Sequence, residues 1–255
     1  MRSTDRELLK QAELNSDEIK RLYSQLDTLH GYERTGVIET LVGSPNCPPD
    51  IYTALFPLAP NQGLLNPAWP LFLIEGQFLH ELDRAFIATC LRHGNTTSTF
   101  LEALTSHPVG WIARAARQHV TLVGEASADW EQELLDDFTT RLWRDSSLVW
   151  VMRAGALPDA INRRLPYPLQ PQPLLPEGER QKVLEKIAGQ RGTSLATVLA
   201  IAHMQNPLQK WAEHPHWERR FALALNPTIK LMKKRLQQDG HVWVRAAARG
   251  SEGIL

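Results

Sequence analysis

The chain has 255 residues, of which 43% are hydrophobic, and its 28 basic residues match its 28 acidic residues in number. This length and composition are typical of a folded protein with a large apolar interior and exclude a disordered chain. The longest apolar runs fall far short of the roughly 20 residues that span a bilayer, and the N-terminus has no signal-peptide pattern. We therefore expect a cytoplasmic protein that makes no membrane contact.

Helical periodicity dominates the chain from its beginning, and strand alternation is nearly absent. Thr4 with Glu7 and Asn15 with Glu18 each fit a capping box, in which two side chains bond the first free amides of a helix. Apolar stripes at helical spacing follow over residues 19–26, 79–90 and 134–142. The sequence therefore predicts an all-α fold.

Three Asn-Pro pairs each stand ahead of an apolar segment, at residues 66–67, 206–207 and 226–227. Asparagine is a good N-cap, and proline suits the first helical position because it lacks an amide that would be unpaired there. We expect each pair to start a helix. The His-Pro pairs at 107–108 and 214–215 suggest the same more weakly.

A degenerate repeat combines an aromatic or apolar residue, an arginine and small apolar residues. Its clearest copies superimpose on four arginines, and two poorer copies precede them, over 32–41 and 69–76. The four arginines are Arg114, Arg153, Arg220 and Arg245. Repeats of 20 to 50 residues are typical of solenoids, whose helical units bury apolar faces only against their neighbours. We expect an α-solenoid in which the Trp and Ala residues of the repeat form the core.

Residues 158–176 contain six of the 17 prolines. Prolines at this density prevent a regular helix and favour an extended path. The sequence therefore predicts three parts: an N-terminal helical-repeat lobe over 1–157, a proline-rich linker over 158–176 and a C-terminal helical-repeat lobe over 177–255.

The stretch 212–250 reads AEHPHWERRFALALNPTIKLMKKRLQQDGHVWVRAAARG. It resembles the bacterial variant leucine-rich repeats, which are related to HEAT and armadillo helical repeats. The resemblance implies a right-handed curved stack of helices that offers a surface to a partner. Some members hold an iron–sulfur cluster, but Cys47 and Cys90 are too few to ligate one, so we expect no cofactor and two ordinary buried thiols.

Residues 205–250 carry nine Lys or Arg against three acids in a chain that is neutral overall. Three of the lysines lie at i, i+3 and i+4 on one predicted helix face, and two of the arginines repeat that spacing on the last helix. Residues 125–137 are acidic. The predicted partner-binding residues are Arg220, Lys230, Lys233, Lys234, Arg245 and Arg249. The alternative is that these charges only solvate outer faces.

The repeated arginine also has two interpretations. It can bond the carbonyls or carboxylates of a neighbouring turn and so fix the stacking of helices, which we favour, or it can line a binding groove. The clustered histidines His203, His214, His216 and His241 could in principle bind zinc, but their positions at turns favour a structural role, and we expect no metal site.

No common catalytic or phosphate-binding motif occurs in the sequence. The leading hypothesis is therefore a non-enzymatic helical-repeat scaffold or adaptor that binds a protein with an acidic surface, with no small-molecule substrate. The alternative is a HEAT-like nucleic-acid-binding protein that uses the basic C-terminal lobe. An enzyme with a site between the lobes ranks third.

Overall fold

The computed structural model describes residues 14–69, 71, 79, 82–143 and 145–250. Within these ranges every regular element is a helix, and the only β-type pairing consists of two isolated bridges, so the predicted all-α class is confirmed. None of the helices described there is long and apolar enough to cross a membrane.

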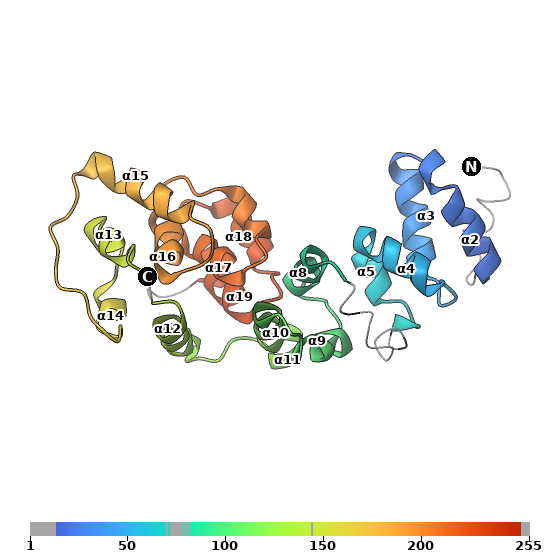
Figure 1. Cartoon of the computed structure of the whole chain (residues 1–255), viewed down its shortest axis with the longest axis horizontal. Helices are drawn as coiled ribbons and strands as arrows, with labels where there is room; N and C mark the ends of the chain where they lie inside the picture. The colour runs from blue at the N-terminus through green and yellow to red at the C-terminus, as the bar shows by residue number, and fades with distance from the viewer. Residues whose placement is uncertain (1–13, 70, 72–78, 80–81, 144, 251–255) are drawn as a thin grey trace. The chain divides into compact units, whose positions relative to one another are not determined.

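The chain forms two compact units, which are described separately (Figure 1). The first unit comprises the residues up to Cys90 and Thr96–His107, and the second comprises Leu91–Asn95 and the residues from Pro108 onward. The proline-rich segment 158–176 therefore lies inside the second unit. The division into lobes on either side of this segment stays a prediction.

Short helices and one aromatic cluster build the first unit. Tyr52, Phe56, Trp69, Phe86 and Phe100 pack with ring centroids 4.4 to 6.1 Å apart, and each side chain is at most 5% exposed. Aromatic rings in such edge and offset contacts contribute most of the apolar burial in a small core. The helices are α2 Ser16–Ser24, η1 Leu26–Thr28, α3 Gly31–Gly43, α4 Pro49–Leu55, η2 Phe56–Leu58, α5 Pro60–Leu64, α8 Arg84–Arg92, whose last two residues belong to the second unit, and α9 Ser98–Leu104.

Helix α17 lies at the centre of the second unit, where it packs against α16, α18 and α19 (Figure 1). Apart from Leu225, every residue of α17 is buried, and its second half, FALAL, alternates large and small apolar side chains, as dense packing between helices requires. The helices of this unit are α10 Gly110–Arg117, α11 Val120–Val123, α12 Trp130–Arg141, α13 Leu148–Arg153, α14 Asp159–Asn162, α15 Glu177–Ala188, α16 Leu195–His203, η3 Gln209–Glu213, α17 Trp217–Leu225, α18 Lys230–Leu236 and α19 Val242–Arg249.

The local signals at the first described helix are confirmed. The Asn15 side chain accepts the amides of Asp17 and Glu18, and the Glu18 carboxylate accepts the amide of Asn15. The similar pair formed by Thr4 and Glu7 lies outside the described residues. Cys47 and Cys90 are free and buried, as expected, and burial, together with the Asp50 carboxylate, raises the pKa of Cys47 to about 12.

The expectation that Asn-Pro starts a helix is wrong at Asn226. Helix α18 begins only at Lys230, and the Asn226 side chain instead donates to the carbonyls of Ile201 and Met204, both at 2.8 Å, at the end of α16. Its amide oxygen accepts the Thr228 amide. Buried carbonyls at a helix C-terminus have no hydrogen-bond donor within the helix. A buried asparagine that supplies this donor therefore fixes its own turn to the end of that helix.

Asn66 repeats this arrangement in the first unit. Its side chain donates to the carbonyls of Val42 and Ser44 at 2.7 and 2.8 Å and accepts the Ala68 amide, and it is 2% exposed. Asn206, in contrast, is exposed. Two of the three Asn-Pro pairs therefore bond the end of a preceding helix.

The repeat segments coincide with helices, but their residues do not share one environment. The segments over 111–118, 217–225 and 242–250 form α10, α17 and α19, and their alanines are mostly buried, as predicted for a core. Trp217 and Trp243 are buried too, whereas Trp150 in the α13 copy is 47% exposed. The copy over 69–76 lies largely outside the described residues.

Candidate functional site

Three consecutive charged residues of α17 are buried, and each bonds a different neighbour. Glu218 accepts a hydrogen bond from Arg141 at 2.9 Å. Arg219 donates to the carbonyls of Ala188 and Gln190 at 3.1 and 2.6 Å, just beyond the end of α15. A guanidinium at a helix C-terminus supplies donors that the last carbonyls lack, so these bonds fix α15 against α17.

Arg220 is the most deeply buried of the three, with 2% of its side chain exposed. Its Nε and one terminal nitrogen donate to the two carboxylate oxygens of Asp239 at 2.7 and 2.9 Å. The other terminal nitrogen donates to the carbonyls of His214 and Pro215. Four of the five guanidinium donors are thus satisfied, which is the condition under which a buried charge is tolerated.

Asp239 begins a turn that is bonded to two earlier turns of the chain. The Gly240 amide donates to the Arg92 carbonyl, the Gly240 carbonyl accepts the Val120 amide, and the Val242 amide donates to the Gln118 carbonyl, at 2.8 to 3.1 Å. A Cβ on Gly240 would lie 2.3 Å from the Leu91 carbonyl oxygen. The three turns therefore stack so closely that only glycine fits between them.

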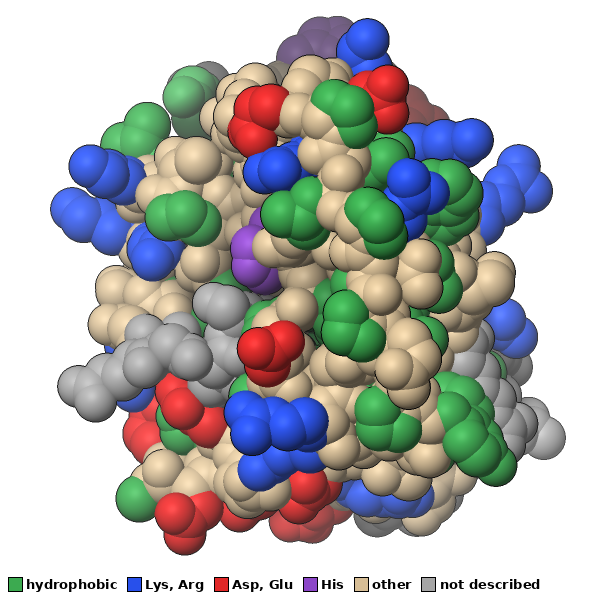
Figure 2. All heavy atoms as spheres, turned by 90° about the vertical axis from the view of Figure 1, so that its left-hand side faces the viewer, with side chains coloured by type: hydrophobic (Ala, Val, Ile, Leu, Met, Phe, Trp, Pro, Cys, Tyr) green, Lys and Arg blue, Asp and Glu red, His purple; other side chains and the backbone are tan. Residues whose placement is uncertain are grey.

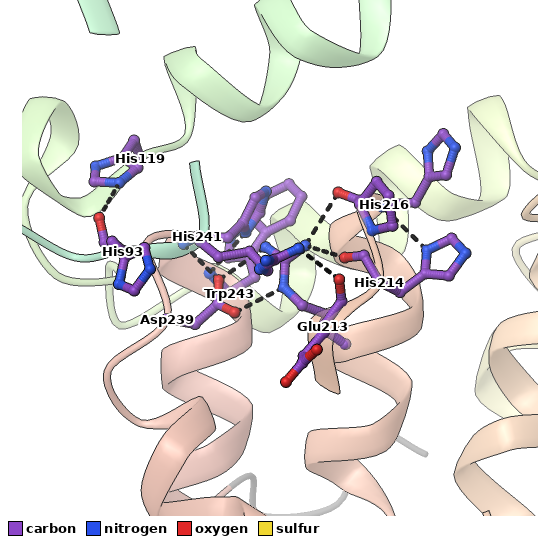
Figure 3. A network of polar contacts seen from close by, with 11 residues as sticks. His93, His119, Glu213, His214, His216, Asp239, His241 and Trp243 are labelled. Carbon is purple, nitrogen blue, oxygen red and sulfur yellow. Dashed lines mark hydrogen bonds and ion pairs between the residues drawn. The ribbon is translucent and has the colours of Figure 1, made fainter. Parts of the chain in front are cut away.

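Each of three histidines in these loops caps its own turn with Nδ1. Nδ1 of His119 accepts the Thr121 amide, Nδ1 of His241 accepts the Trp243 amide, and Nδ1 of His214 accepts the amide two residues later. A ring nitrogen that accepts an amide carries no proton, so these rings are neutral with the proton on Nε2. Nε2 of His119 then donates to the His93 carbonyl, as drawn in Figure 3, and that of His241 donates to Gln118.

The surroundings of these rings disfavour protonation. Burial lowers the pKa of His119 and of His214 to about 4, and burial together with the nearby Arg220 holds the pKa of His241 well below its usual value. The His241 ring stacks on Trp217 at 4.0 Å between centroids. The three rings are therefore neutral side chains near the buried pair of Arg220 and Asp239.

Six residues were predicted from the sequence to bind a partner, and for Arg220 this prediction is wrong. Its guanidinium is enclosed and makes four hydrogen bonds inside the fold, so it cannot reach a partner. Arg220 therefore has the first of the two roles considered for the repeated arginine, which is to fix the stacking of turns. Arg114, its counterpart in α10, is exposed and has no such role.

The two arginines of α19 are bonded to the acidic stretch. Arg249 donates to both carboxylate oxygens of Glu125 at 2.7 and 3.2 Å, and Arg245 lies 3.4 Å from the same carboxylate. Arg245 is 17% exposed and Arg249 is 48% exposed. The acidic stretch 125–137 and the basic stretch 205–250 are far apart in the sequence. Within the second unit, part of their charge is thus neutralised by ion pairs between them.

The lysines of α18 are placed differently. Lys230 and Lys234 are exposed and Lys233 is half-buried, and in the described part of the chain none of the three is paired with a carboxylate. Leu231 lies among them with 90% of its surface exposed. We call these four residues, Lys230, Leu231, Lys233 and Lys234, the lysine face of α18.

The residues that complete the buried network do not stand out in the sequence. Asp239 counted only as one of three acids in a basic region, although it is the partner that allows Arg220 to be buried. The triplet Asp239-Gly240-His241 is the sequence signal for this role. An aspartate two residues before a turn histidine can accept that histidine's amide, as Asp239 does here. Within the described residues no three His, Cys, Asp or Glu side chains are grouped so that they could hold a metal ion.

The geometry defines an all-α protein with a buried Arg–Asp–His network and one lysine-rich helix face. No family model matches the chain, and no curated protein or solved structure gives a match either.

Proposed function

We propose that the protein is a non-enzymatic helical-repeat scaffold that binds a partner protein through the lysine face of α18. The observation that carries the proposal is the contrast between arginines and lysines in the same region. Arg219, Arg220 and Arg249 are all bonded within the fold, whereas the lysines of α18 have no described carboxylate partner. Positive charge that does not stabilise the fold is available to attract a partner with an acidic surface.

The exposed leucine favours a protein over a nucleic acid as the partner. Leu231 is 90% exposed at one edge of the lysine face, and burying such a side chain contributes about 1.5 to 3 kcal/mol to an association. A phosphate backbone offers no apolar surface to cover it. A nucleic acid bound by these lysines alone is the alternative function.

The repeat architecture is part of the same proposal. Asn66 and Asn226 bond the end of a preceding helix in the same way, and His119 and His241 cap equivalent turns. Identical local bonds at recurring sequence positions support a stack of related units, akin to the variant leucine-rich repeats. Such stacks hold a helix face rigid, which lowers the entropy cost of binding.

Charge reversal tests this function. The variant Lys230→Glu with Lys234→Glu changes the lysine face, and Lys182→Glu with Lys186→Glu makes the same change at exposed positions of α15 in the same unit. Affinity capture from cells of the natural source is expected to recover a stoichiometric protein with the wild type and the α15 variant but not with the α18 variant. Equal recovery with the α18 variant, or no stoichiometric protein at all, would contradict the proposal.

A second measurement separates the alternative. Duplex and single-stranded DNA are titrated into the wild-type protein at two salt concentrations. Nucleic-acid binding through lysines weakens steeply with salt because counterions are released from the phosphates. Tight, salt-dependent binding that is lost in the α18 variant would support the nucleic-acid function instead.

A further inference from the structure

The proline-rich segment between α14 and α15 has a conformation that its sequence imposes. From Leu165 to Pro176 every residue is a proline or precedes one, except Leu169 and Leu174. Proline fixes its own φ and keeps the preceding residue out of the helical region. Pro176 accordingly has φ −52° and ψ 144°, close to polyproline II values; the chain bends at residues 165–167, and residues 168–176 form no helix, turn or bend.

Both ends of this segment are fastened to the second unit. Near its start, Asn162 donates to the Leu169 carbonyl at 3.0 Å and accepts the Leu169 amide at 2.9 Å. Near its end, the Leu175 amide donates to the Arg153 carbonyl, and the Leu175 carbonyl accepts a bond from Arg180. Leu175 is buried. The segment is therefore a tethered strand with a defined path.

The middle of the segment faces solvent. Residues 170–174 are all exposed, and no hydrogen bond from them to the rest of the described chain is present. Figure 2 views the molecule from the end where this segment lies in Figure 1, and hydrophobic side chains are scattered over that face between basic and acidic ones. Backbone carbonyls and proline rings on this strand are thus available together.

Polyproline II has three residues per turn, so side chains three apart line one ridge. Leu169, which is half-buried, and Leu175, which is buried, lie two turns apart on one ridge, with the exposed Gln172 between them. The other two ridges are exposed: one carries Pro168, Pro171 and Leu174, and the other carries Gln170, Pro173 and Pro176. Grooves that bind polyproline II helices contact two neighbouring ridges and their carbonyls.

We propose that residues 168–176 are a docking strand for a small domain whose aromatic-lined groove binds polyproline II helices. The pairs Tyr167-Pro168 and Gln170-Pro171 follow each other at the three-residue spacing that such grooves accept. Because the strand is already extended and held at both ends, binding costs little conformational entropy. This surface is separate from the lysine face of α18 and adds a second partner to the proposed scaffold.

The test uses the full chain and a panel of purified SH3, WW and EVH1 domains, followed by NMR titration of the isotope-labelled chain. We expect at least one domain to bind with shift changes centred on residues 168–176. Pro168→Ala with Pro171→Ala is expected to weaken that binding about tenfold or more, since it removes the outer ridge. Gln172→Ala, an exposed change off the outer ridges, is the matched control and is expected to leave affinity within about twofold.

Thermal unfolding of both variants shows whether the fold is retained, as the exposure of these positions predicts. The proposal is overturned if no domain of the panel binds the wild type, or if the Pro168→Ala, Pro171→Ala variant binds as well as the Gln172→Ala variant. The Lys230→Glu, Lys234→Glu variant should keep the strand's affinity. Failure of the docking strand is therefore distinguishable from failure of the proposed function.

Discussion

Arg220 and Asp239, 19 residues apart in the sequence, form a two-point ion pair inside the second unit. The pair joins α17 to the turn before α19, and neither side chain is more than 4% exposed. Asp239 also accepts the amide of His241. The same carboxylate thus satisfies the guanidinium and shapes the turn that carries the stacked histidine.

Removing one member of the pair should therefore destabilise the protein strongly. We expect Arg220→Ala to lower the free energy of unfolding by about 3 to 5 kcal/mol, because Asp239 is left as an unpaired buried charge. Urea unfolding followed by circular dichroism measures the change. Arg249→Ala, which breaks a half-exposed pair with Glu125, is the control and should cost about 1 kcal/mol or less. Similar losses for the two variants would contradict the structural role of Arg220.

A Cβ at Gly240 should disrupt the stacked turns. Gly240→Ala places a methyl group 2.3 Å from the Leu91 carbonyl oxygen and 2.4 Å from His119 Nε2, so the turns must separate. We expect a loss of about 1 to 3 kcal/mol in the free energy of unfolding, as for other overpacked sites. Gly178→Ala is the matched control: it lies in α15 with nothing within 4 Å, and alanine there should stabilise by about 0.5 to 1 kcal/mol.

The neutral histidines should make stability depend on pH. An ordinary histidine titrates near pH 6.5, whereas the folded protein holds the pKa of His119 and His214 near 4. Between these values the unfolded chain binds protons that the folded chain does not, so stability is full above pH 6.5 and falls as the pH is lowered toward 4. Each histidine should cost about 1.4 kcal/mol per pH unit in this window. Urea midpoints at pH 7, 5.5 and 4.5 measure the slope.

Replacing one histidine shows whether these residues cause the loss of stability at low pH. In His119→Asn the side-chain oxygen can still accept the Thr121 amide, as Asn226 accepts the amide of Thr228, but it cannot titrate. We expect lower stability at pH 7, because the bond to the His93 carbonyl is lost, and a shallower decline toward pH 4.5. An unchanged slope would show that His119 does not contribute to the acid sensitivity.

The Asn-Pro pairs should differ in importance according to burial. Asn226→Ala leaves the carbonyls of Ile201 and Met204 without their donor inside the protein, and we expect a loss of about 2 to 4 kcal/mol in the free energy of unfolding. Asn206→Ala changes an exposed member of the same motif and should fall within about 0.5 kcal/mol of wild type. Equal effects in equilibrium unfolding would rule out the bridging role of Asn226.

Local signals in the sequence predicted local structure well. The Asn15 and Glu18 capping box formed as expected because both of its partners lie within three residues, and the helical periodicity gave the all-α class. The role of Asn-Pro was predicted wrongly at Asn226 because an amide side chain can bond either the next helix or the previous one. Sequence spacing does not distinguish these choices, since the carbonyls of Ile201 and Met204 are more than 20 residues away.

The sequence by itself determined the helical class, the buried cysteines and the extended course of the proline-rich segment. Each of these depends on residues that are close together in the chain or on average hydrophobicity. Only the tertiary structure decided which positive charges remain outside. The sequence shows Arg220 and Lys230 only as two positively charged residues. In the fold, Arg220 is buried and paired with Asp239, whereas Lys230 is exposed to solvent. The charge of a side chain follows from its residue type, whereas its burial and its ion-pair partner depend on contacts between segments that are distant in the sequence.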